Sequence, residues 1–217
     1  MDKLVLFLGP NAAGKTTLAR KVCEERPYEY MSGDNNWDEI VENKILARRL
    51  IEKSICHSDK NMRSCLQGYK NNSDSELLER VENLSERQQD QLVNIVFGLF
   101  LVEKITTCEK IPLYEGFFVN RRQRLRLYND LVSFLPGFDS ICKNLFFVDV
   151  DYEITEKRLI AKGVFDKKQA LKTEMRNRMK DIPSNSEWPN TKVHYIDGSR
   201  PVEVSAAEIL GILDQNS

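Results

Sequence analysis

Short apolar runs alternate along the chain with longer stretches in which apolar residues recur every three or four positions. Five of the runs are predicted to be strands, over residues 4–8, 28–31, 111–114, 145–150 and 193–196. The fourth run is the strongest because β-branched and aromatic residues dominate it, and the second is weak because it is short and mixed. Strands that alternate with helical patterns are typical of a parallel sheet. We therefore expect an α/β fold, a five-stranded parallel sheet sandwiched by helices.

Residues 35–109 interrupt this alternation between the second and third predicted strands. They have almost no strand character, and their apolar residues predict one helix over 40–55 and another over 77–100. We interpret 35–109 as a helical insertion, a probable acceptor-side subdomain, with 1–34 and 110–217 forming the core. Near the end of the chain, Ser205-Ala-Ala-Glu208 resembles a capping box that opens a final helix.

A phosphate-binding motif directly follows the first predicted strand. Residues 9–16 read Gly-Pro-Asn-Ala-Ala-Gly-Lys-Thr, a complete G-x-x-x-x-G-K-[ST] sequence, and a helical pattern over 18–25 comes next. Glycines let the backbone wrap a phosphate, and successive N–H groups and the helix N-terminus converge on the anion. Lys15 can reach the β- and γ-phosphates, and Thr16 can place its hydroxyl on Mg²⁺. The predicted nucleotide-binding residues are Gly9, Asn11, Ala12, Ala13, Gly14, Lys15, Thr16 and Thr17.

Two acidic residues follow other predicted strands. Glu115 ends the third, where an acid lies beside the metal in P-loop folds, so we predict that it holds Mg²⁺ together with Thr16. The alternative is an acid that faces solvent. Asp34 follows the second strand and could accept the proton of an acceptor hydroxyl. The alternative for Asp34 is a cap on a helix that begins near Asn36.

Two basic stretches are candidates for binding phosphates. Residues 121–126 hold four arginines in six positions, and Arg121 and Arg122 are candidate acceptor-binding residues. On a helix that begins near Asn120, the predicted core side is formed by Leu125, Tyr128, Leu131, Val132 and Leu135. Residues 157–180 contain nine basic and two acidic residues, which suits a lid over about 163–182. A solvated helix face is the alternative for either stretch.

Length and composition limit the class of protein, its compartment and its partners. The 217 residues fit one domain with an inserted subdomain, and no run approaches the roughly 20 apolar residues of a membrane span. A strand begins almost at once, so we expect no signal peptide. Five scattered cysteines and two histidines make a structural zinc site improbable and indicate a cytoplasmic protein with reduced thiols. A net charge of −1 argues against binding nucleic acid by bulk charge, although a local basic groove stays open.

Two further segments are similar to known kinases. Residues 114–123 resemble the Asp-Gly-Phe-Pro-Arg-x-x-x-Gln stretch of adenylate-kinase-type enzymes, with Glu for Asp and no proline. Arg158-Leu-Ile-Ala-Lys162 resembles their Arg-Leu-x-x-Arg, with Lys for the second Arg. The chain thus resembles the P-loop kinases of the nucleoside-monophosphate-kinase-like group. The resemblance implies that Arg158 contacts ATP and that Arg176 or Arg178 contacts the transferring phosphate. We therefore predict that Arg158, together with Arg176 or Arg178, stabilises the transition state of phosphate transfer.

Within that group, the chain looks closest to the polynucleotide 5′-hydroxyl kinase branch. The similar features are Gly33-Asp34, Asn120-Arg121-Arg122, Ile182-Pro183 and Trp188-Pro189. In that branch the Asp after the second strand is the general base, which implies this role for Asp34. The insertion is larger than this branch leads us to expect.

The sequence therefore predicts an enzyme that moves the γ-phosphate of ATP·Mg²⁺ to a hydroxyl on a nucleic acid end or a nucleotide. Open alternatives are a small-metabolite kinase similar to gluconate or shikimate kinases, a nucleoside monophosphate kinase and, with less support, an NTP-dependent switch ATPase. The arginines at 121–126 favour a nucleic acid, and the weakly acidic insertion favours a small acceptor. The sequence leaves open the acceptor, the preference for ATP over GTP and the oligomeric state.

Overall fold

The chain divides into two compact units. The computed structural model describes residues 3–33, 39–40, 43–57, 83, 85–116, 120–163 and 181–215. The first unit, here the core unit, comprises Met1–Gly33, Cys108–Asn129 and Gly137–Ser217. The second, here the helical unit, comprises Asp34–Thr107 and Asp130–Pro136.

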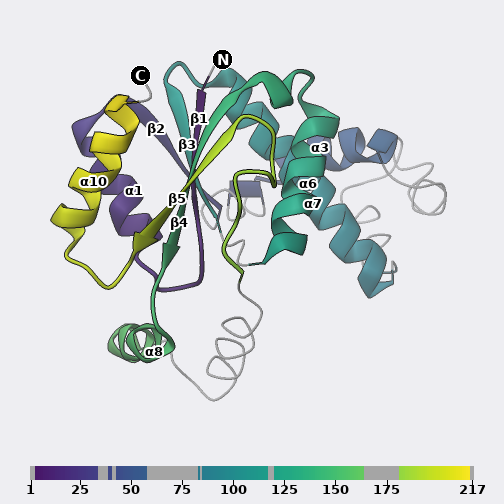
Figure 1. The fold of residues 1–217 in the computed structure, drawn as a ribbon. Coiled ribbons are helices and arrows are strands. Elements are labelled where there is room, and N and C mark those ends of the chain that lie inside the picture. The colour runs from purple at the N-terminus through teal and green to yellow at the C-terminus, as the bar shows by residue number, and fades with distance from the viewer. Residues whose placement is uncertain are drawn as a thin grey trace. The chain divides into compact units, whose positions relative to one another are not determined.

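The core unit is built on a five-stranded sheet in which every pair of neighbouring strands is parallel (Figure 1). The strand order is β2-β3-β1-β4-β5. The strands are β1 (Lys3–Leu8), β2 (Tyr28–Ser32), β3 (Ile111–Gly116), β4 (Cys142–Asp149) and β5 (Thr191–Asp197). The predicted sheet is confirmed. β4 begins three residues before the predicted start, because the ladder includes the buried polar residues Lys143 and Asn144.

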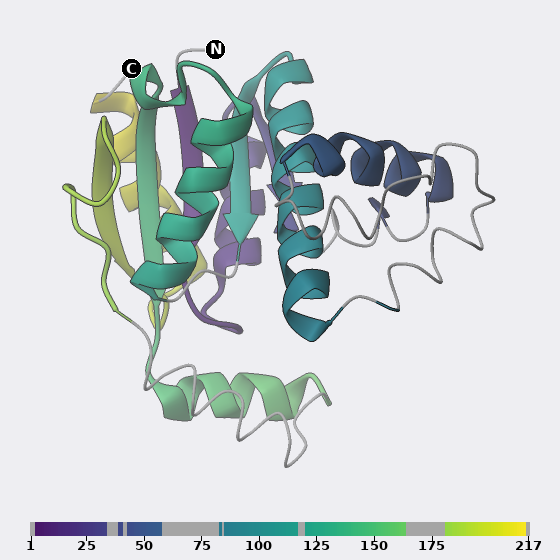
Figure 2. The same cartoon turned by 90° about the vertical axis from the view of Figure 1, so that its right-hand side faces the viewer.

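Among the described residues, four α-helices and one short 3₁₀ helix lie wholly or partly in the core unit. They are α1 (Lys15–Glu25), α7 (Arg121–Phe134), η2 (Phe138–Ser140), α8 (Tyr152–Ala161) and α10 (Val202–Gln215). Helices α1 and α10 lie on the same face of the sheet (Figure 1). Helix α8 lies beyond the carboxyl ends of the strands (Figure 2). Because all five strands point the same way, the loops that follow them gather at one edge of the sheet.

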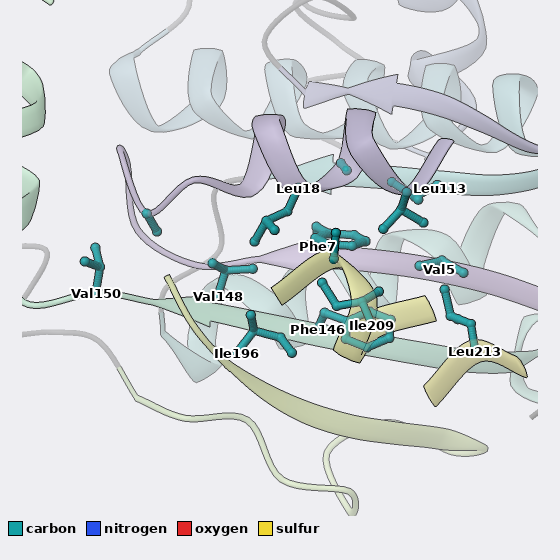
Figure 3. Close-up of a cluster of buried hydrophobic side chains, with 14 residues drawn as sticks. Val5, Phe7, Leu18, Leu113, Phe146, Val148, Val150, Ile196, Ile209 and Leu213 are labelled. Atoms are coloured by element: carbon teal, nitrogen blue, oxygen red, sulfur yellow. The ribbon is translucent and has the colours of Figure 1, made fainter. Parts of the chain in front are cut away.

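The hydrophobic core explains why β1 is apolar at nearly every position. Val5 and Phe7 point to the face that α1 and α10 cover, where they pack with Ile209 and Leu213 (Figure 3). Leu4, Leu6 and Leu8 alternate with them and are fully buried. A central strand of a parallel sheet is covered on both faces and therefore needs apolar side chains in both directions.

The helical unit is organised around α3 (Lys44–His57) and α6 (Glu86–Thr107). One cluster of its buried apolar side chains consists of Ile40, Leu46, Leu50, Leu92, Ile95, Val96 and Phe100. The Asn43 side chain accepts a hydrogen bond from the Leu46 N–H at 3.0 Å and caps α3, which is why this helix begins later than its apolar pattern. The predicted stretch 77–100 begins outside the described residues, and α6 continues past it to Thr107.

Two local predictions differ from the structure. On α7 the predicted core residue Leu131 is buried, but Val132 is 37% exposed, and Arg124 and Leu127 are buried instead. Arg124 can take a core position because carboxylates compensate its charge. Helix α10 begins at Val202 and not at Ser205. Pro201 suits a helix start, and its carbonyl accepts the N–H groups of Val204 and Ser205, so Ser205 is buried inside the helix.

Candidate nucleotide-binding site

The phosphate loop between β1 and α1 has the positive backbone φ angles that its glycines permit. Gly9 has a φ of 142°, and a Cβ there would lie 2.0 Å from the Val148 carbonyl oxygen. Ala12 and Gly14 also have positive φ values, of 57° and 101°. Only glycine fits at position 9, since both the dihedral and the close approach exclude a side chain. The loop then passes into the first turn of α1, whose N–H groups suit an anion.

Lys15, Thr16 and Glu115 meet beside this loop. The Lys15 ammonium group is buried, donates to the Pro10 carbonyl at 2.8 Å and lies 3.9 Å from Glu115 Oε1. The Thr16 hydroxyl donates to Glu115 Oε2 at 3.2 Å. Parallel pairing positions Glu115 beside Phe7, two residues before the loop begins. A threonine hydroxyl and a carboxylate are hard oxygen donors, so this pair fits Mg²⁺ held jointly with phosphates and water.

Tyr30 on β2 belongs to the same cluster, and the sequence analysis missed it. Its phenol donates to Glu115 Oε2 at 3.0 Å, and the Arg20 guanidinium lies 5.7 Å from the centre of its ring. Burial, reinforced by the nearby Glu115 carboxylate, raises the pKa of Tyr30 above its usual value. The sequence placed Tyr30 in a predicted strand but did not show which strand lies beside it, and the pairing of β2 with β3 is what brings it to Glu115.

Arg158 on α8 joins the phosphate loop to the loop after β5. Its two terminal nitrogens donate to the carbonyls of Ala12 at 3.0 Å and Gly198 at 2.8 Å. Gly198 is required here, because a Cβ would lie 2.3 Å from the Ala13 carbonyl oxygen. The turn is held further by Asp197, whose pKa is lowered by hydrogen bonds from Ser199.

A pocket of about 450 Å³ opens between these two loops. The phosphate-loop side is formed by residues 12–18, and the opposite side by Arg158, Ala161, Lys162, Gly198, Arg200 and Val202. Arg200 is held by an ion pair with Glu208 of α10. The sequence analysis missed Lys162, Gly198 and Arg200 as lining residues, although Gly198 closely follows the predicted strand at 193–196. Because cationic side chains line both sides of it, the pocket suits an anionic ligand such as an NTP.

The remaining predicted site residues lie elsewhere or outside the described residues. Arg121 and Arg122 have exposed side chains at the start of α7, and the Arg121 backbone N–H donates to the Asp181 carboxylate at 3.0 Å. Asp34, Arg176 and Arg178 lie outside the described residues, as do positions 164–180 of the predicted lid. The roles assigned to these residues from the sequence stay predictions.

Arg124, from the same basic run as Arg121 and Arg122, is buried and bonded to other parts of the protein. It is 1% exposed, and its guanidinium donates to the Glu187 carboxylate at 2.8 Å and the Asp181 carboxylate at 2.6 Å. It also donates to the Asp181 carbonyl at 3.0 Å. These bonds fix the start of the segment that leads into β5.

Comparison with known proteins agrees with this architecture. A family model described as an AAA domain matches residues 4–98, which is less than half of the chain. No curated protein sequence matches the chain.

Among the described residues, no helix is both long and apolar enough to cross a membrane.

Solved structures match over nearly the whole chain at low sequence identity. A sugar kinase from Janibacter sp. HTCC2649 is 16% identical with a TM-score of 0.56, and the match covers 99% of this chain and 95% of that one. A gluconokinase from Sinorhizobium meliloti 1021 is 13% identical with a TM-score of 0.52, over 98% of this chain and 92% of that one. A protein from Thermus thermophilus, TT1252, is 15% identical with a TM-score of 0.53 over the full length of both chains. The chain therefore has the P-loop kinase fold, as predicted.

Proposed function

We propose that this chain is an ATP-dependent phosphotransferase that moves the γ-phosphate of ATP·Mg²⁺ to a hydroxyl group of a small acceptor. The observation that supports this most strongly is the meeting of Lys15, Thr16 and Glu115 beside a phosphate loop. A buried ammonium group, a hydroxyl and a carboxylate at a helix N-terminus suit a phosphate chain and its divalent cation.

Each residue in the site has a defined part in this proposal. The loop N–H groups and Lys15 bind the phosphates, and Thr16 and Glu115 hold Mg²⁺, which when bound neutralises phosphate charge. Arg158 lines the neighbouring pocket and adds positive charge beside the loop. Asp34 is proposed to orient the acceptor hydroxyl and accept its proton, and Arg158 with Arg176 or Arg178 to stabilise the transferring phosphate.

The acceptor class is the finer part of the proposal. Two of the similar structures are named as a sugar kinase and a gluconokinase. They favour the small-metabolite alternative that the sequence left open over the nucleic acid end. We therefore propose a polyol or sugar-acid hydroxyl as the acceptor, bound on the side of the insertion over 35–109.

A nucleotide or a polynucleotide 5′ end is the second candidate. It is favoured by the exposed side chains of Arg121 and Arg122 at the start of α7. Exposed arginines can bind successive phosphates of a nucleic acid, whereas a small metabolite needs a closed pocket.

Transfer of labelled γ-phosphate to a panel of acceptors tests the proposal. The panel holds sugar acids, polyols, nucleoside monophosphates and 5′-hydroxyl oligonucleotides, and Asp34→Asn and Lys15→Ala are run in parallel. Label on a polyol or sugar acid, lost in Lys15→Ala, is the expected result. Label on oligonucleotides alone would overturn the acceptor assignment. Release of free phosphate with no labelled acceptor would favour an ATPase. Lys15→Ala activity above about a tenth of wild type would contradict the P-loop mechanism.

A further inference from the structure

Glu115 receives two hydroxyl donors on the same oxygen. Thr16 Oγ1 donates to Oε2 at 3.2 Å from α1, and the Tyr30 phenol donates to it at 3.0 Å from β2. The other carboxylate oxygen, Oε1, faces the Lys15 ammonium group at 3.9 Å. Since Glu115 is 7% exposed, water has little access to replace either hydroxyl.

The direction of these bonds matters for a cation. Each hydroxyl hydrogen points to Oε2, so the Thr16 oxygen keeps its lone pairs for another partner. Tyr30 adds a second bond to the same oxygen, from β2 and not from α1, and so restrains the rotation of the carboxylate. A second donor of this kind determines how a ligating carboxylate is oriented.

Arg20 extends the arrangement back to α1. Its guanidinium lies over the Tyr30 ring at 5.7 Å, and Arg20 follows Thr16 by one helical turn. The residues therefore form a ring of contacts, from Thr16 to Glu115, Tyr30 and Arg20 and back along the helix. Such a ring of contacts restrains the position of the phenol.

We propose that Tyr30 is a positioning residue that sets the Glu115 carboxylate for a divalent cation bound with the nucleotide. This inference rests on the proposed function, because it assigns Glu115 to that cation. Tyr30→Phe removes only the donated hydrogen bond and keeps the ring in the core. Loss of an outer partner of a metal ligand typically weakens metal affinity about 10- to 100-fold, so we expect a loss of at least about tenfold.

Tyr28 supplies a matched control. It lies two residues earlier on β2, on the same face, and packs against the same hydrophobic cluster as Tyr30. Tyr28→Phe removes a phenol from the same strand without touching Glu115. We expect its effect on cation affinity to stay within about twofold.

The experiment measures Mn²⁺ binding in the presence of ADP by electron paramagnetic resonance, so no turnover is needed. ADP binding with a chelator present is measured alongside. The expected result is weaker Mn²⁺ binding in Tyr30→Phe, with metal-free ADP binding unchanged and Tyr28→Phe like wild type. Equal Mn²⁺ affinity in Tyr30→Phe and wild type would overturn the inference alone, as would a parallel loss of metal-free ADP binding. Failure of the wild-type chain to bind ADP would overturn the proposed function as well.

Discussion

Arg124 on α7 and Arg158 on α8 are both held by partners distant in sequence, but the partners differ in kind. Arg124 meets two carboxylates, Glu187 at 2.8 Å and Asp181 at 2.6 Å. Arg158 donates to two backbone carbonyls, those of Ala12 and Gly198. Among the residues that the structure describes, Arg158 has no carboxylate partner. The charge of Arg124 is thus compensated inside the fold, whereas that of Arg158 is oriented but not neutralised.

The difference separates a structural arginine from one suited to a ligand. Carbonyl dipoles hold a guanidinium in place without cancelling its net charge, so Arg158 still attracts an anion in the pocket that it lines. Arg124 has no such capacity, because its donors and its charge are already satisfied. Both arginines come from basic stretches, so residue type alone does not distinguish them.

Replacing Arg158 should have the largest effect. We expect Arg158→Ala to lower turnover by roughly 10³-fold, the scale for an arginine that stabilises a transferring phosphate, with little change in unfolding free energy. Arg158→Lys keeps the charge but loses the two-pronged bridge, so its turnover should be intermediate. Steady-state phosphate transfer and urea unfolding measure the two effects, and Lys157→Ala, an exposed neighbour, is the control. A stability loss with normal turnover per folded molecule would make Arg158 structural.

Arg124→Met should show the opposite pattern. It leaves the Glu187 carboxylate, 5% exposed, without its cation, and breaking a buried pair costs about 3–5 kcal/mol of unfolding free energy. Asp181 is 49% exposed and adds little, because water can solvate it. Arg126→Met, an exposed arginine on the same helix, should change stability by less than about 0.5 kcal/mol. Urea unfolding of the three proteins gives the comparison.

A paired apolar replacement sharpens the contrast. In Arg124→Met with Glu187→Leu, both buried charges are gone, and such replacements are often neutral. We expect the double variant to be about 2 kcal/mol or more above Arg124→Met in unfolding free energy, with turnover retained. If the double variant were as unstable as the single one, the geometry of the ion pair and not its charge would hold the segment.

The smallest expected effect is on the pH dependence of stability and comes from His194 on β5, which belongs to neither arginine's contacts. Its ring stacks on Phe146 at 5.0 Å, and burial lowers its pKa below 6.5. The unfolded chain therefore takes up the proton first as pH falls. Stability should be lost as pH drops from above 6.5 through the folded pKa. Urea midpoints from about pH 7.5 to 5.5 measure this slope, which His194→Gln should flatten.

The local parts of this molecule could be predicted, because their causes lie in adjacent residues. The strand β1 and the phosphate loop follow from an uninterrupted apolar run and a motif of eight residues. The five strands follow from the same alternation of apolar segments. Glu115 could be assigned to the site because a strand end in a parallel sheet determines where its side chain lies.

The side-chain contacts of the remaining residues could not be predicted, because they join residues that are distant in sequence. Tyr30 and Glu115 are 85 residues apart, and Arg158 is 146 residues from its partner Ala12. The buried role of Arg124 depends on Glu187, 63 residues away. The apolar pattern of α7 did not place Arg124 in the core, because that pattern does not show which carboxylates pack against the helix. The acceptor was hardest to predict, since helices alone do not identify what they bind.

The central claim is that this fold transfers the γ-phosphate of ATP with Lys15 and Arg158 as participants and Arg124 as a structural residue. Single-turnover transfer of labelled γ-phosphate to the sugar-acid and polyol panel tests it most directly, with wild type, Lys15→Ala, Arg158→Ala and the apolar double variant side by side. The account predicts labelled acceptor from wild type and the double variant, and almost none from the other two. Equal labelling by all four proteins, or labelling lost only in the double variant, would contradict it.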